Sequence, residues 1–192
     1  DAFPVNEWWL HNLVGPFDDD EKIAGVYCRQ IPRENADCLT KRQLNRWLTG
    51  RMTKDISFIE AKNTYKNLLP MQKYMFCNFD NVCSCIRKSV WKEYPFDKTY
   101  FAEDLEWSKK VLEAGYKIVY QPDAAIIHSH SRSLMYEYKR TYLCHRRLYN
   151  LFKLQTVPSM KHVIKFYFSK IFSDMKFIFQ MHLFIKRQDS MK

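Results

Sequence analysis

The sequence is poor in the residues that fibrous and low-complexity chains need. Among 192 residues it contains only four glycines and seven prolines, and we find no internal repeat with a period of about 20–50 residues. Hydrophobic residues make up 46% of the chain and aromatic residues 16%. A chain of this length and composition can bury a sizeable core. We therefore expect one globular domain, with or without an appendage.

Targeting signals and a cysteine metal motif are also missing. The first ten residues start with an aspartate and lack the apolar stretch of a signal peptide. No segment has the roughly 20 nearly uninterrupted apolar residues that cross a bilayer. Cys83 and Cys85 are too close in sequence for a usual zinc pair, and no second pair follows. We expect reduced thiols in a cytoplasmic protein.

Positive charge is concentrated at one end of the chain. The formal net charge is +10, and residues 131–192 hold 13 Lys and Arg against 3 Asp and Glu. Residues 1–130 hold 18 of each and are neutral. A basic end indicates contact with an anionic membrane surface or a polyanion, whereas a neutral body does not favour a general nucleic-acid groove.

Strand and helix patterns alternate along the body. Residues 23–31 are apolar and β-branched, which predicts a buried strand. Residues 102–114 form the clearest helical pattern, with a Glu106–Lys110 pair at i,i+4 and Gly115 as its stop. Two strands should follow, at 116–122 and 124–130, joined by a turn at 121–123. This alternation predicts an α/β fold.

The end of the chain is predicted to be helical. We expect residues 1–135 to form one unit and residues 136–192 a basic amphipathic helical extension. Within it, residues 159–187 show polar side chains at helical spacing on an otherwise Phe-, Ile- and Met-rich segment. This helix is expected either to lie on an anionic bilayer or to dock on the body, and both alternatives stay open.

Two acidic residues lie at the start of the clearest helix. Glu103 and Asp104 would occupy its first turn, where negative charge complements the helix dipole, so simple capping is one interpretation. The flanking Phe101 and Trp107 indicate a cleft in which sugars could stack. A helix start should also keep Asp104 ionised, as a general base must be. The sequence thus offers Asp104 as a proton acceptor.

Two histidines follow the last predicted strand. His128 and His130 are two residues apart, which places both on one face of a strand. Zinc needs three or four ligands, and no further His or Cys lies at motif distance. A Mn²⁺ or Mg²⁺ site would combine carboxylate oxygens with at most one imidazole. Asp1 is the available carboxylate, if the fold brings it close.

The order of these motifs resembles a known family. An aspartate before "AFPVNEWWL", the strand "IAGVYCRQ", then "EDLEW" and "GYKIVYQPDAAIIHSHS" are similar to the C-terminal half of glycosyltransferase family 2. The likeness is greatest to bacterial rhamnosyltransferase-like enzymes of polysaccharide assembly and covers roughly residues 1–140. It implies part of a GT-A fold, which is a Rossmann-like α/β domain, followed by a helical extension.

The resemblance also implies residue roles. Asp104 would be the catalytic base, with Glu103 and Trp107 near the acceptor. Asp1 and His128 would bind the divalent metal, Mn²⁺ or Mg²⁺. The remaining residues expected near donor or acceptor are His130, Arg29 and Gln30.

The implied activity is an inverting transfer of a sugar. The donor would be a dTDP- or UDP-linked nucleotide-sugar, and the acceptor a hydroxyl of a glycan or lipid-linked molecule at the inner membrane face. The first residues begin inside an element, so we expect a longer parent protein that holds the nucleotide-binding half. The chain alone is then expected to be inactive. The rival interpretations are a basic nucleic-acid or polyanion-binding module and a membrane-docking segment without catalysis.

Overall fold

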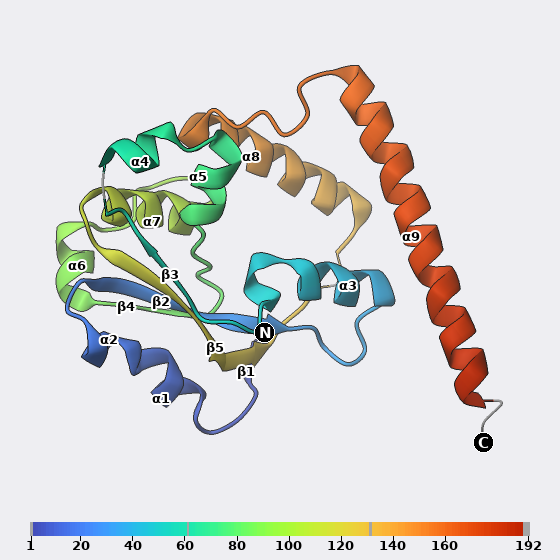
Figure 1. Cartoon of the computed structure of the whole chain (residues 1–192), viewed down its shortest axis with the longest axis horizontal. Coiled ribbons are helices and arrows are strands. Elements are labelled where there is room, and N and C mark those ends of the chain that lie inside the picture. Colours follow the sequence, from blue (N-terminus) through green and yellow to red (C-terminus); the bar gives the residue numbers. More distant parts are fainter. Residues whose placement is uncertain (1, 61, 131, 190–192) are drawn as a thin grey trace. The chain divides into compact units, whose positions relative to one another are not determined.

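The computed structural model describes residues 2–60, 62–130 and 132–189 (Figure 1). Its helices and strands follow one another in this order: β1 (Phe3–Pro4), α1 (Trp9–Val14), α2 (Pro16–Asp19), β2 (Ile23–Ile31), α3 (Cys38–Arg46), the 3₁₀ helix η1 (Leu48–Gly50), β3 (Asp55–Phe58), α4 (Lys62–Asn67), α5 (Pro70–Phe76), β4 (Ser84–Ile86), α6 (Lys88–Glu93), α7 (Glu103–Glu113), β5 (Lys117–Ile127), α8 (Leu134–Phe152) and α9 (Met160–Asp189).

The centre of the fold is a mixed sheet. Its order is β1-β5-β2-β4, and β3 pairs with β5 outside this path. The two central strands, β2 and β5, run parallel with Val26 opposite Val119, while the other pairs are antiparallel. Both central strands are almost continuously apolar and buried, as expected for strands covered on both faces. The predicted α/β class is confirmed, and the arrangement is that of a partial Rossmann-like domain with C-terminal helices.

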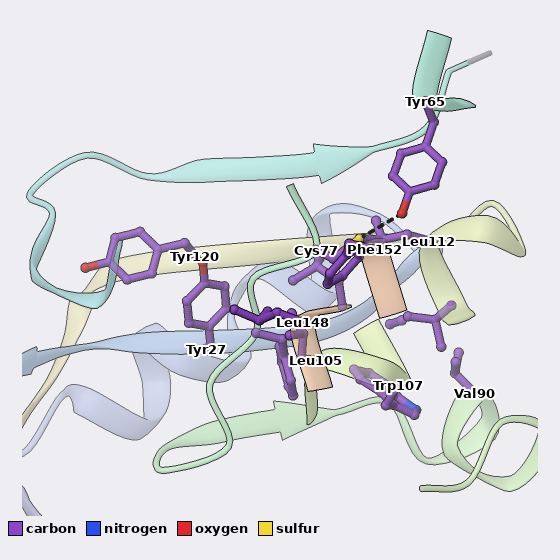
Figure 2. Packing of buried hydrophobic residues seen from close by; sticks show 14 of the residues in the cluster. Tyr27, Tyr65, Cys77, Val90, Leu105, Trp107, Leu112, Tyr120, Leu148 and Phe152 are labelled. Carbon is purple, nitrogen blue, oxygen red and sulfur yellow. Dashed lines mark hydrogen bonds between the residues drawn. The ribbon is translucent and has the colours of Figure 1, made fainter. Parts of the chain in front are cut away.

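Each face of the sheet has its own core cluster. On one face, α1 and α2 cover a small cluster built around Leu13, Val26 and Val119. On the other face, α5, α7 and α8 enclose a larger, aromatic-rich cluster (Figure 1). Figure 2 shows this second cluster, in which Trp107 and Leu148 approach the sheet from different helices. The sheet is therefore the middle layer of a three-layer unit.

The last strand differs from its prediction. In place of two strands joined by a turn, β5 is a single strand with a register shift, in which Cys28 pairs with Gln121 but Arg29 pairs with Ala125. Pro122 lies in this irregular stretch. Because proline has no N–H for a ladder hydrogen bond, a bulge accommodates it inside a central strand. The predicted turn is thus a bulge that the strand passes through.

Helix α7 begins and ends close to its predicted bounds. Gly115, with a φ of 93°, terminates it in the left-handed region as expected. The predicted Glu106–Lys110 pair is wrong. Glu106 instead forms an ion pair with Arg147 of α8, and Lys110 contacts Asp97 at 2.6 Å. The Arg147 contact ties α7 to α8, and the Asp97 contact ties α7 to the loop that precedes it.

The chain separates into two compact units. The first spans Asp1–Leu154 and the second Gln155–Lys192. Helix α8 therefore belongs to the first unit, although we expected the extension to begin at residue 136. The helix predicted at 159–187 is confirmed as α9. Over the described part of the chain, no helix has both the length and the apolar character that crossing a membrane requires.

Candidate active site

A cleft of about 750 Å³ lies in the first unit, where the two parallel strands end. Gln30 from the end of β2 and His128 just after β5 both line it. Ligands of α/β sheets commonly bind outside the carboxyl ends of parallel strands. The start of α7 and residues of α3 and α8 form the remaining walls. Of the residues predicted from the sequence, the cleft brings together Gln30, Glu103, Asp104, His128 and His130.

Asp104 is held by two backbone donors. The N–H of Leu105 donates to its Oδ1 at 2.7 Å, and the N–H of Asn81 donates to its Oδ2 at 3.2 Å. Burial nevertheless raises the pKa of the Asp104 carboxyl from 3.8 to about 6, against the effect of both donors. The helix start therefore does not by itself fix the charge of this group. At neutral pH the carboxylate form still predominates, and a pKa nearer to the working pH makes a better general base.

The backbone before Asp104 has an unusual conformation. Ala102 has φ 54° and ψ 46°, in the left-handed region. This conformation costs a non-glycine residue about 1–2 kcal/mol, and such residues concentrate at functional sites. The turn starts α7 abruptly and places Glu103 and Asp104 on the cleft wall. The strained residue, Ala102, is two positions before Asp104, the candidate base.

The two histidines lie in contact with each other. Their ring centroids are 4.4 Å apart, with the ring planes at 88°. His128 is buried, and its Nδ1 lies 3.1 Å from Oε1 of Gln30. With that oxygen as acceptor, Nδ1 carries the hydrogen and Nε2 keeps its lone pair. Burial, and then the neighbouring His130, lower the pKa of His128, so its imidazole is neutral at pH 7.

These properties suit a metal ligand only in part. A neutral imidazole whose second nitrogen donates to a carbonyl oxygen is the usual form of a ligating histidine. Asp1, the other predicted ligand, lies outside the described residues. Within residues 2–60, 62–130 and 132–189, no three His, Cys, Asp or Glu side chains gather so that they could hold a metal ion. His128 therefore has the properties of a metal ligand, and Asp1 as the second ligand stays a prediction.

Two predicted residues do not face the cleft. Trp107 is only 1% exposed, its indole N–H donates to the carbonyl of Tyr94 at 2.8 Å, and its ring packs on Phe79 and Phe96. Core residues thus cover the ring, which does not line the cleft, and its predicted place near the acceptor stays a prediction. Arg29 is absent from the cleft lining as far as the chain is described. Successive strand residues point to opposite sides, and Gln30 is the one that lines the cleft.

The sequence analysis missed the segment between α5 and β4. Asp80 lines the cleft and contributes to the raised pKa of Asp104. It is fixed by a turn in which the Val82 N–H donates to its Oδ1 at 3.0 Å. The next residue, Asn81, supplies the N–H that holds Asp104 and accepts a hydrogen bond from Ser84 (2.9 Å). The polar residues Asn78, Asp80 and Asn81 were visible in the sequence, but nothing there linked them to a residue more than 20 positions later.

Basic side chains also line the cleft. Arg132 precedes α8, and Arg140 and Arg147 belong to that helix. Arg147 is paired with Glu106, and Arg132 lies 3.7 Å from Glu137. The guanidinium of Arg140 lies 5.9 Å from the ring centre of Phe101. A cleft lined by both carboxylates and guanidinium groups suits a ligand with hydroxyls at one end and an anionic group at the other.

A smaller hollow adjoins the cleft. It measures about 540 Å³ and shares Tyr100 and Arg147 with the cleft, but it contains neither Asp104 nor His128. The larger cleft is therefore the candidate active site.

The chain is similar in sequence to known proteins. No family model matches the chain. Over 143 residues, or 73% of its length, the chain is 31% identical to the O-antigen chain rhamnosyltransferase WbaN of Salmonella anatum. It is 29% identical over the same length to the O-antigen chain rhamnosyltransferase RfbN of Salmonella typhimurium strain LT2. The aligned part spans 42% of each of these relatives. The chain is thus similar to part of two rhamnosyltransferases, which supports the resemblance seen in its motifs.

Proposed function

We propose that this chain supplies the acceptor-side and catalytic part of an inverting glycosyltransferase for cell-surface polysaccharide. The observation that carries the proposal is Asp104, which projects into the cleft with a pKa raised to about 6 and with its carboxylate held by two N–H donors. Similarity to two O-antigen chain rhamnosyltransferases supports the same class of reaction.

In the proposed reaction, Asp104 takes the proton from an acceptor hydroxyl. A sugar hydroxyl is far too weak an acid to ionise alone, so the proton moves to the carboxylate as the oxygen attacks the anomeric carbon. The N–H groups of Leu105 and Asn81 hold the carboxylate in one orientation, which keeps its free lone pairs directed toward the cleft. One base and one attack invert the configuration at that carbon. Glu103, beside Asp104 on the cleft wall, would contact the acceptor.

The arginine-lined part of the cleft would hold the leaving nucleoside diphosphate. Arg132 and Arg140 place positive charge where negative charge develops as the glycosidic bond breaks. His128, with Asp1 as its predicted partner, would hold a Mn²⁺ or Mg²⁺ ion, which neutralises diphosphate charge when bound. His130 and Gln30 complete this end, because Gln30 fixes the ring of His128.

The substrates follow from the relatives and the motifs. The names of the relatives favour rhamnosyl transfer, which points to a dTDP-linked donor, with a UDP-linked sugar as the alternative. The acceptor would be a glycan or lipid-linked sugar hydroxyl. Since the matched region is less than half of each relative, the complete activity would belong to a longer protein.

The decisive experiment compares two Asp→Asn variants in the chain together with whatever precedes it in the native protein. Asp104→Asn should lower kcat at least about 100-fold, the usual contribution of a general base, and leave the KM for the donor unchanged. Asp123→Asn, the same chemical change at an exposed position of β5 outside the cleft, should keep activity. Transfer by Asp104→Asn within about tenfold of wild type would remove Asp104 from the mechanism. A polyanion-binding module would bind its ligand equally well with either variant.

A further inference from the structure

Helix α9 is the main element of the second unit and exposes most of its apolar side chains. It runs for 30 residues, about 45 Å at the normal rise of a helix. Most of its aromatic and aliphatic residues are between 36% and 71% exposed, namely Met160, Val163, Ile164, Phe166, Tyr167, Phe168, Ile171, Phe172, Met175, Ile178, Phe179, Leu183 and Phe184. A helix this apolar needs an apolar surface to cover it.

The apolar and polar residues occupy different sides of α9. With about 100° of rotation per residue, Ile164, Ile171, Met175 and Ile178 fall along one line of the helix. Lys165, Ser169, Lys176 and Gln180 lie about 100–160° around the helix from Ile164 as a narrow polar stripe, which Lys161 joins to the apolar line at about 60°. We call the first set the apolar face and the second the basic stripe. Phenylalanine side chains lie between the apolar face and the basic stripe. Apolar residues therefore cover more of the helix circumference than the stripe does.

One lysine has a separate role. Lys170 lies about 120° from Ile164 in the direction away from the stripe, and its Nζ is 2.6 Å from Oδ2 of Asp174. The pair places no net charge on that side, and Asp174 is the less exposed partner. The positive charge of the helix is therefore carried by the stripe and by its C-terminal end. Overall, Met160–Asp189 contains six basic and two acidic residues.

We propose that α9 lies flat on an anionic lipid bilayer, with its apolar face among the acyl chains and its basic stripe at the headgroups. A wide apolar face with bordering lysines is the arrangement of an interfacial helix. A second copy of the helix would match the apolar face but would bring like charges together, whereas anionic headgroups complement them. The inference does not depend on the proposed reaction, because it rests on α9 alone.

The experiment is co-sedimentation of the whole chain with vesicles of phosphatidylcholine alone or mixed with phosphatidylglycerol. Lys165→Gln with Lys176→Gln should weaken binding to the anionic vesicles about 25-fold, since each lysine near an anionic surface contributes about fivefold. Ile171→Gln with Met175→Gln should weaken it about 30-fold through lost apolar burial. The matched control, Lys170→Gln with Asp174→Asn, removes the internal pair without changing net charge and should bind like wild type.

The same samples test the other possible occupants of the apolar face. Light scattering gives the oligomeric state, and circular dichroism shows whether each variant keeps its helices. Equal binding to both vesicle types, or binding unaffected by the stripe variant, overturns the proposal. So does a dimer without vesicle binding that Ile171→Gln with Met175→Gln dissociates. Absence of vesicle binding together with loss of solubility in that variant would assign the face to packing on the body, and also overturns it.

Discussion

The raised pKa of Asp104 predicts that the candidate base destabilises the fold at neutral pH. Its folded-state pKa of about 6 lies above the ordinary 3.8, a difference of about two that corresponds to about 3 kcal/mol. Because the folded-state pKa is raised, the contribution to stability is fully present below pH about 4 and is lost as the pH rises through about 6. Above that pH the buried charge lowers the free energy of unfolding.

Asp104→Asn removes this charge and keeps the shape of the side chain. The carboxamide has one acceptor oxygen for the two N–H donors, so the variant also loses about 1–2 kcal/mol of hydrogen bonding. We expect a gain of about 1–2 kcal/mol in unfolding free energy at pH about 7.5 and a loss of similar size at pH about 4.

Urea unfolding at both pH values measures these changes, and subtracting the wild-type values cancels the titration of all other groups. Ser84→Ala is the control, because it perturbs the same segment through Asn81 without removing a titratable group, and its effect should not depend on pH. If the effect of Asp104→Asn differs by less than about 1 kcal/mol between the two pH values, the argument that burial sets this pKa is refuted.

Two further predictions concern single side chains. Trp107→Ala should lower the unfolding free energy by about 3–5 kcal/mol, because the ring is buried in the core. Near-native stability together with impaired acceptor binding would instead show that Trp107 contacts the acceptor. His128→Ala should weaken Mn²⁺ binding, measured by calorimetry, more than His130→Ala does, because His128 is the buried neutral imidazole fixed by Gln30; the opposite ranking would show that His130 is the ligand.

Much of the fold was predictable because local patterns and tertiary structure agree. The apolar run at 23–31 is β2, the amphipathic pattern after Ala102 is α7, and Gly115 ends it where a left-handed residue is needed. The prediction failed where tertiary contacts, and not the local sequence, determine the backbone conformation. Pro122 indicates a turn in isolation, yet pairing with β2 on both sides of the bulge carries β5 through it.

The site was predictable only in part. Asp104 and His128 follow from position and residue type, and the structure places both in the cleft. Asp80 and Asn81 were missed because their role depends on a contact between loops that are distant in sequence. The burial of Trp107 in the core was not predictable, because an aromatic residue beside a carboxylate has the same local pattern whether it faces a sugar or the core.

The parallel pairing of β2 with β5 has a consequence for how the chain folds. Val26 and Val119 are partners, so the centre of the sheet joins segments about 90 residues apart, and the entropy of closing that loop must be lost before the strands gain contacts. We therefore expect α7 and α8 to form early and the sheet to close late, in milliseconds to seconds. During that interval the apolar edges of β2 and β5 stay open to other chains, so refolding yield should fall as protein concentration rises.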